Sequence, residues 1–261
     1  MKTIAALALI LATTGCRRQP SPTVFLDPAL GVLVPPDTTM LAGIRMQRIR
    51  ATSFSEELKN SPRLSEFTKS MGLLGESDIW EILIASNGIQ WVALLRGKFT
   101  AMGMEPRIDK PSARRENFNG IPIIGDEKGA VAFLNPTTAI AGSFDAVLQT
   151  VERRNANSGV PEPLRKLTEE IPSTNEAWLA SVGPVPSFLP VSKIKFGRAG
   201  FDPRTRAIDL AMEAESPGAA KSIGDAINGR VEGTHVTVQG PTMANLVDWM
   251  LGRSSRAPAT R

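Results

Sequence analysis

Histidine and cysteine, the side chains that most often bind metals or act as nucleophiles, are few in this chain, and this limits the sites that the chain can form. The 261 residues contain one histidine and one cysteine. A His-His metal pair, an H-E-x-x-H helix and a C-x-x-C site therefore cannot be built from one copy of the chain, and we predict no metal and no cofactor. His235 lies in the run GTHVTVQ, where Val236 and Val238 alternate toward a core. The same alternation leaves His235 on the polar face of a strand, which predicts a surface histidine.

Nucleophilic catalysis has one sequence match. Ser192-Lys193-Ile194-Lys195 fits the S-x-x-K pattern, which needs a serine at a helix start so that the lysine lies one turn later on the same face. The segment instead favours a strand, where residues three apart point to opposite faces, and S-D-N, K-T-G and G-x-S-x-G are absent from the sequence. We therefore predict no catalytic residue. The alternative is an envelope hydrolase that uses dispersed carboxylates, such as Asp109 or Asp126, in a shared pocket.

Cys16 is the one residue for which the sequence predicts a covalent modification. It follows a positive Lys2, an apolar run over residues 4–12 and a few small residues, which is the layout of a secretory signal. That run is too short to span a bilayer, which needs about 20 apolar residues. Thr13-Thr14-Gly15-Cys16 resembles the lipobox of bacterial lipoproteins, with Thr13 where Leu is usual. The resemblance implies a diacylglyceryl group on the Cys16 sulfur and, usually, an acylated amino terminus.

A lipid on Cys16 fixes the expected location. Two or more acyl chains anchor a protein stably, whereas one chain gives only marginal binding. We expect export to the cell envelope, facing the periplasm or at the outer membrane, and Arg17 in place of the inner-membrane Asp favours the outer membrane by analogy. The alternatives are an ordinary cysteine beside a plain cleavage site and a buried small side chain. With one cysteine, no disulfide can form within the chain.

Composition bounds the class of the mature protein. Removal of residues 1–15 leaves 246 of the 261 residues, of ordinary apolar and charged content. The formal charge is +4 and the sequence pI about 9.5. No tyrosine occurs, and the basic residues are scattered rather than gathered beside stacking aromatics, so we predict no nucleic-acid partner. A basic module that associates with anionic membrane surface stays an alternative.

Alternating apolar runs and turn signals predict the strands and helices. IWEILIASNGIQWVALLRGKF predicts a hairpin with a type I′ turn at Asn87-Gly88. GAVAFLNPTTAIAGS predicts a second strand pair, followed by a helix capped by Ser143. In the second half, KIKFGRAGFD and RAIDLAMEAES predict a hairpin, and Ser216 caps the next helix. Helices are also expected after Ser53, from Ser61-Pro62, around residues 164–171 and over residues 243–250, with a last strand at THVTVQG.

These elements predict an α+β fold of two ferredoxin-like subdomains, each with an antiparallel sheet packed against helices. The second half follows the βαββαβ order, and the first half has an extra hairpin and a degenerate crossover near TAMGMEPRIDKPSARR. We expect a signal peptide over residues 1–15, a flexible tether over 16–33, subdomains over 34–157 and 158–251, and a disordered tail over 252–261.

The chain also resembles a set of uncharacterised bacterial lipoproteins. The likeness is carried by the opening PPDTTMLAG, the strand EILIASNG and the run AVAFLNPTTAIAGS, and it covers most of the mature chain. It implies the same fold and export, and it carries no activity and no site residue.

The predicted function is a lipid-anchored, non-catalytic binding or scaffolding module of the cell envelope. It is anchored to the membrane through Cys16 and is expected to have an envelope protein as partner. Trp80, Trp91 and Trp178 are the candidate interface anchors, since aromatic side chains dominate interface hot spots. The other interpretation of these three residues, as core side chains within apolar strands, is favoured by the sequence around them.

Overall fold

The described part of the chain is built around strands. The computed structural model describes residues 23–60, 79–99, 105–106, 108, 111–127, 129–156, 159–183, 194–227 and 229–241. The strands of the first half are β1 (Met40–Ile44), β2 (Ile79–Ser86), β3 (Trp91–Gly97), β4 (Arg114–Phe118), β5 (Ile121–Asp126), β6 (Gly129–Asn135) and β7 (Thr138–Gly142). Those of the second half are β8 (Ala177–Ser181), β9 (Ile194–Asp202), β10 (Ala207–Ala214), β11 (Arg230–Glu232) and β12 (His235–Pro241).

Short helices connect and cover these strands. They are α1 (Pro28–Gly31), α2 (Met46–Ile49), α3 (Ser55–Lys59), α5 (Phe144–Arg153), α6 (Glu162–Thr168) and α7 (Pro217–Ile227). The helices expected from Ser61 and over residues 243–250 lie outside the described residues, as do the signal segment, Cys16 and the tail.

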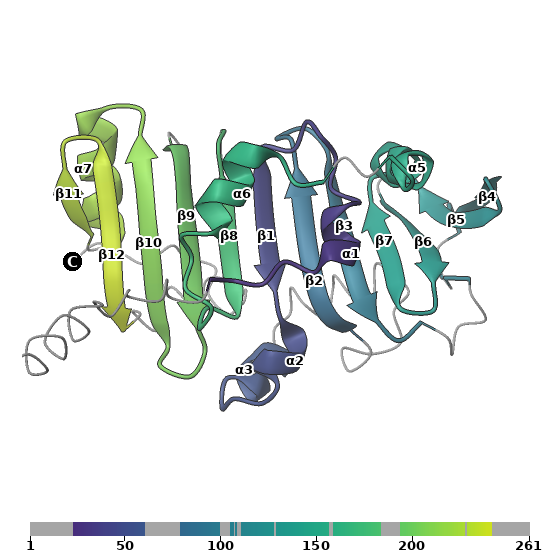
Figure 1. The fold of residues 1–261 in the computed structure, drawn as a ribbon, viewed down its shortest axis with the longest axis horizontal. Coiled ribbons are helices and arrows are strands. Elements are labelled where there is room, and N and C mark those ends of the chain that lie inside the picture. Colours follow the sequence, from purple (N-terminus) through teal and green to yellow (C-terminus); the bar gives the residue numbers. More distant parts are fainter. Residues whose placement is uncertain are drawn as a thin grey trace, which may run out of the picture.

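All described strands belong to one antiparallel sheet. Its order is β11-β12-β10-β9-β8-β1-β2-β3-β7-β6-β5-β4 (Figure 1). The α+β class with antiparallel strands is thus as predicted. The two halves meet at β1 and β8, whose register is centred on Ala42 opposite Leu179. Outward from this junction the order corresponds on the two sides, with β2, β3 and β7 matching β9, β10 and β12.

The predicted ferredoxin-like arrangement is not confirmed. A βαββαβ unit of that kind uses helical crossovers, which bring strands of the same direction together. Here β9 pairs with β8 and β10 pairs with β9, both antiparallel, and β12 then pairs antiparallel with β10. In the second half β8, β9, β10 and β12 therefore lie side by side, and β11 pairs with the outer edge of β12. Both halves share one sheet instead of having a sheet each.

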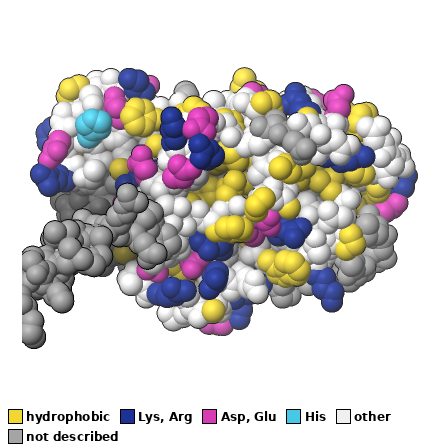
Figure 2. Space-filling view, viewed as in Figure 1, with side chains coloured by type: hydrophobic (Ala, Val, Ile, Leu, Met, Phe, Trp, Pro, Cys, Tyr) yellow, Lys and Arg dark blue, Asp and Glu magenta, His cyan; other side chains and the backbone are white. Residues whose placement is uncertain are grey.

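Helices lie on both faces of the sheet. On the front face of Figure 1, α1 and α6 lie over the strands, and their buried side chains join those of α5 and the central strands in the largest core cluster. Behind the sheet, α7 covers β10 and β12 through Ala220 and Ile223. At the lower end of β1, Ile49 of α2 packs with Phe54 against Phe201. The front of β9, β10 and β12 carries charged side chains instead (Figure 2), such as the ion pair of Arg198 with Asp209 at 3.1 Å.

The part of the predicted tether that the structure describes belongs to the folded region. Residues 23–31, which we call the strap, cross the front of the sheet instead of extending from it. The Val24 N–H donates to the carbonyl of Ile171 at 2.9 Å, and Leu30 is fully buried in the main core. The Asp27 side chain accepts from the Ala29 N–H and caps α1. Burial of apolar side chains makes this segment part of the domain, so the folded region begins by residue 23 rather than 34.

The Asn-Gly pairs at residues 87–88 and 119–120 behave differently. Asn119 and Gly120 both have positive φ and form the two-residue turn between β4 and β5. That hairpin was not predicted; its region had been assigned to a degenerate crossover and the segment after it. At the predicted turn, by contrast, the loop runs over residues 87–90 and only Gly88 has positive φ. The hairpin of β2 and β3 is confirmed, and its type I′ turn is wrong.

Candidate functional site

Most of the sequence-predicted chemistry does not come together in the described structure. Cys16, Asp109 and Ser192 lie outside the described residues. Asp126 ends β5 and accepts hydrogen bonds from the Ser112 hydroxyl at 2.7 Å and the Gly129 N–H at 3.1 Å. Those bonds shape a turn, so Asp126 has a structural role here.

The remaining candidates lie on the surface or in the core. His235 is exposed at the start of β12, opposite Glu213 and Glu232, as expected of a surface histidine. Lys195 lies in β9, as the strand prediction required, and pairs with Glu213 at 3.7 Å.

The three tryptophans divide between the two interpretations. Trp178 is buried at 5% exposure and packs over Gly43. Trp80 and Trp91 are 38% and 39% exposed, so these two keep surface that a partner can contact.

Two classes of site are not found in the part of the chain that the structure covers. In it, no three His, Cys, Asp or Glu side chains are grouped so as to hold a metal ion. None of the helices described there is both long and apolar enough to cross a membrane.

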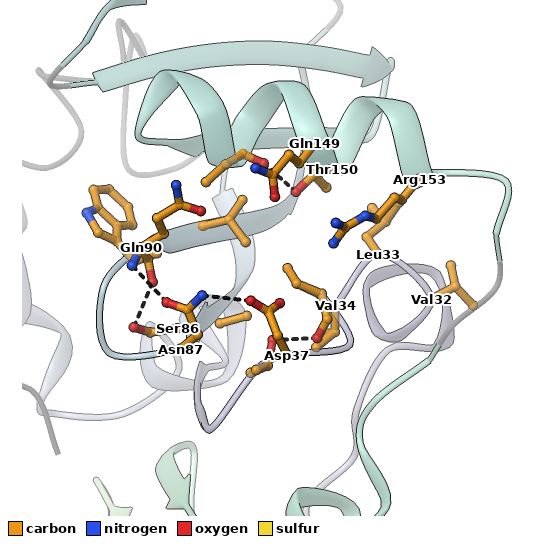
Figure 3. A pocket seen from close by; sticks show the side chains of 16 residues that line it. Val32, Leu33, Val34, Asp37, Ser86, Asn87, Gln90, Gln149, Thr150 and Arg153 are labelled. Carbon is orange, nitrogen blue, oxygen red and sulfur yellow. Dashed lines mark hydrogen bonds between the residues drawn. The ribbon is translucent and has the colours of Figure 1, made fainter. Parts of the chain in front are cut away.

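A pocket lies where the tip of the β2–β3 hairpin meets α5 and the loop after α1. It is partly open to solvent and has about 30 Å³ of water-accessible space, which is room for about two water molecules or one small side chain. The floor is apolar and buried, and the rim is polar (Figure 3). The floor and walls include Leu33, Val34, Ala85, Val92 and Ala146, and the rim includes Asp37, Ser86, Asn87, Gln90, Gln149, Thr150 and Arg153.

The hairpin tip beside this pocket is held by its own side chains. The Asn87 carbonyl oxygen Oδ1 accepts from the Ile89 and Gln90 N–H groups at 3.0 and 2.9 Å. The Asn87 amide Nδ2 donates to Asp37 Oδ2 at 2.7 Å, and the Ser86 hydroxyl donates to the Gln90 carbonyl at 2.8 Å. These bonds fix the loop that displays Ile89 at 92% exposure and Trp91 next to it.

Polar groups converge on the pocket from opposite sides. Gln149 and Arg153 reach from α5 toward Asp37 and Asn87 on the other wall (Figure 3). α5 is fixed because Phe144, Val147 and Val151 are buried in the main core, so the rim has a firm base. Nothing in the sequence pointed to this site, since its three segments are far apart along the chain.

A cluster of charged residues lies at the other end of the same strands, about 16 Å along β2 from the pocket. Arg96 of β3 binds Asp27 of the strap at 3.0 Å and donates to the hydroxyls of Thr137 and Thr138, both at 2.8 Å. Arg45 lies 3.3 Å from Glu176, whose side chain is 3% exposed. This cluster therefore links the strap to both halves of the sheet.

Glu81 of β2 lies within this charged cluster. Burial and, after it, the charge of Asp27 raise the pKa of Glu81 from 4.5 to about 7, against the lowering effect of Arg45, Arg96 and a hydrogen bond from the Asp27 main chain. Asp27 and Glu81 are thus a carboxyl pair that sequence analysis missed. A glutamate inside the apolar strand IWEILIAS was the available signal.

The pocket and the charged cluster support different chemistry. The pocket offers a small apolar cavity beside hydrogen-bonding groups, which is how proteins orient a bound group. In the charged cluster, the Asp27 carboxylate is already engaged by Arg96 and by the Ala29 N–H, so its oxygens are used in holding the strap. We take the pocket and the adjoining tip as the candidate functional site.

Comparison with known proteins shows a shared fold. No family model and no curated protein matches this chain. Crystal form I of a protein named TP0453 superimposes with a TM-score of 0.56 at 13% identity, over 88% of this chain and 99% of that one. Crystal form IV of TP0453 gives 0.53 at 12% identity, over 87% and 96%. At this identity the likeness shows the fold alone.

Proposed function

We propose that this chain is a lipid-anchored module of the cell envelope that binds an envelope protein and catalyses no reaction. One observation carries the proposal: a rigid hairpin tip displays Ile89 and Trp91 directly beside the pocket. Exposed apolar and aromatic side chains next to a pocket are the usual composition of an interface anchor.

The membrane anchor is part of the same proposal. It is supported by the signal segment and the lipobox-like sequence ending in Cys16, which favour a location facing the periplasm or at the outer membrane. Metabolic labelling with a clickable fatty acid tests it. Label on the wild type that Cys16→Ser abolishes supports the anchor, and label that persists in that variant contradicts it.

The physical character of the tip favours a protein as the partner. Ile89 is 92% exposed in water, so a partner that covers it gains hydrophobic burial at the contact. The side-chain bonds of Asn87 and Ser86 already fix the loop, so little conformational entropy is lost when a partner binds.

We propose that the chain is not catalytic because its carboxyl pair, Asp27 and Glu81, has a structural use. The alternative of a hydrolase needs two carboxyl groups facing a substrate cavity. Asp27 belongs to the strap itself and is held by Arg96 where the strap crosses the sheet beside Glu81. We assign this pair to holding the strap on the sheet.

The proposal also keeps two related subdomains, over residues 34–157 and 158–251. It is supported by the corresponding strand order outward from β1 and β8 and by a hairpin at the same place on each side, β2–β3 and β9–β10. The unit we propose is a set of four neighbouring antiparallel strands, β1-β2-β3-β7 in the first half and β8-β9-β10-β12 in the second.

The binding proposal is tested by crosslinking the intact protein in its native envelope and identifying what is attached by mass spectrometry. We expect a reproducible protein partner whose yield falls at least fivefold in Ile89→Asp. Phe25→Asp is the matched control, because Phe25 is also apolar and exposed, at 57%, but lies on the strap. Equal loss in both variants, or no partner in the wild type, would contradict the proposal.

A further inference from the structure

The pocket combines one positive group, one negative group and a small apolar cavity. Arg153 stands on the α5 side and Asp37 on the opposite wall (Figure 3). In a binding site, such an arrangement selects a ligand that carries a carboxylate, an N–H donor and a small apolar group close together. The identification of that ligand as part of a protein partner rests on the proposed function.

Arg153 carries a positive charge that is not paired with a carboxylate of the described residues. Within the residues that the structure describes, no carboxylate lies at ion-pair distance from Arg153, whereas Arg165 pairs with Glu162 at 2.6 Å. Its neighbour Arg154 is engaged elsewhere, donating to the carbonyls of Val151 at 3.1 Å and Asn119 at 3.4 Å. A guanidinium binds a carboxylate through two parallel hydrogen bonds, so Arg153 is suited to capture one.

Asp37 supplies the complementary acceptor. One of its oxygens, Oδ2, accepts from the Asn87 amide at 2.7 Å, which fixes the carboxylate at the pocket wall. A carboxylate oxygen accepts more than one hydrogen bond, so Asp37 can also take a ligand N–H. The fixed Asn87 therefore orients Asp37 for a donor in the pocket.

The cavity limits the size of the buried group. The water-accessible space of about 30 Å³ over an apolar floor suits a methyl group or a similarly small side chain. The last residue of a peptide carries all three features on one Cα: a free carboxylate, an amide N–H and a side chain.

We propose that the pocket binds the carboxyl-terminal residue of the partner's chain, with a small apolar side chain at that end. The carboxylate pairs with Arg153, the amide N–H donates to Asp37, and the side chain enters the cavity. Ile89 and Trp91, exposed beside the pocket, contact the residues that precede it. Capture of a chain end in this way is a recurring mode of peptide recognition.

The test uses two libraries of biotinylated heptapeptides, randomised over the last four residues, one with free carboxylates and one with amidated ends. Both are bound to the purified mature protein and the retained peptides are sequenced. We expect enrichment only from the free-acid library, with Ala, Ser or Val as the last residue. For an enriched sequence, we expect the acid to bind at least tenfold more tightly than its amide.

Two neighbouring arginines give a matched pair of variants. Arg153→Gln should remove the preference for acid over amide, and Arg154→Gln should keep it, with unchanged circular dichroism in both. Equal enrichment from the two libraries, a large last residue, or a preference that survives Arg153→Gln would overturn the inference. Binding of free carboxylic acids such as acetate at the same affinity would show a site for small anions instead, and would also overturn it.

The outcome is separable from that of the proposed function. If the envelope crosslinks are lost in Ile89→Asp while the libraries show no acid preference, the tip binds a protein and the inference about its chain end fails. If no crosslinked protein exists, the proposed function fails first.

Discussion

Replacement of Glu81 by glutamine should stabilise the protein at neutral and alkaline pH and leave it unchanged in acid. Glutamine has the shape of the protonated carboxyl group and can still accept the hydrogen bond from the Asp27 main chain. The wild-type carboxyl group must ionise in a partly buried position beside Asp27, and that ionisation destabilises the folded state.

The direction follows from proton linkage. Because the pKa of Glu81 is raised in the folded state, the folded protein binds more protons than the unfolded chain between the two pKa values. The stabilising effect of the protonated group is complete below about pH 4.5 and is lost as the pH rises through about 7. The advantage of Glu81→Gln therefore grows over that window and is constant above it.

The magnitude has an upper bound. A rise from 4.5 to about 7, at about 1.36 kcal/mol for each pKa unit, corresponds to at most about 3.4 kcal/mol. Glu81 is only partly buried, and water screens the charges around it, so we expect about 1–2 kcal/mol at pH 8.

Urea unfolding of wild type and Glu81→Gln at pH 5, 6, 7 and 8 measures this difference directly, since all other titrating groups are common to both proteins. Glu152→Gln is the control for the loss of one glutamate, because Glu152 is exposed on α5. A difference for Glu81→Gln that is flat with pH, or that shrinks as the pH rises, would refute the reasoning.

Three further changes test the packing that holds the site. Gly43→Ala would place a methyl group 2.3 Å from the Trp178 ring, so it should lower the free energy of unfolding by about 2 kcal/mol, whereas Gly129→Ala, with open space around it, should change it by less than about 0.5 kcal/mol. Val147→Ala removes fully buried methyl groups that seat α5 on the sheet and should cost about 2 kcal/mol in urea unfolding. Gly120→Ala forces a side chain to φ +79° at the β4–β5 turn and should cost about 1 kcal/mol, seen as a lower Tm.

Local sequence patterns predict strands well where one face of the strand is buried and the other face is exposed to solvent. In β10, Ile208, Met212 and Ala214 are buried and point to one face, as their alternation indicated. The hairpins β2–β3, β6–β7 and β9–β10 and the helices α5 and α7 were also placed correctly. Such signals lie within a few residues of each other, so a single sequence contains them.

What the sequence could not supply was the long-range order. The pairing of β1 with β8 joins residues more than 130 positions apart, and no local signal distinguishes it from two separate sheets. The β4–β5 hairpin was missed because Arg114, Arg115 and Glu116 leave β4 exposed and polar, without an apolar alternation.

The candidate site was hidden for the same reason. Its residues are ordinary by themselves, since Asp37 follows a Pro-Pro turn, Asn87 starts a loop and Arg153 ends a helix. Only the packing of α5 and of the loop after α1 against the central strands brings them around one cavity. The tryptophans show that local sequence does not predict burial. Trp178 and Trp91 lie in similar apolar strands, and only Trp178 is buried.

The most direct test of the central claim is a photo-crosslinking amino acid placed at position 89 of the full-length protein in its native envelope, compared with the same amino acid at position 25. Both positions hold exposed apolar side chains, but Ile89 lies at the hairpin tip and Phe25 lies on the strap. We predict a discrete crosslinked protein from position 89 and none from position 25. The same products from both positions, or crosslinks from position 25 alone, would contradict a binding site at the hairpin tip.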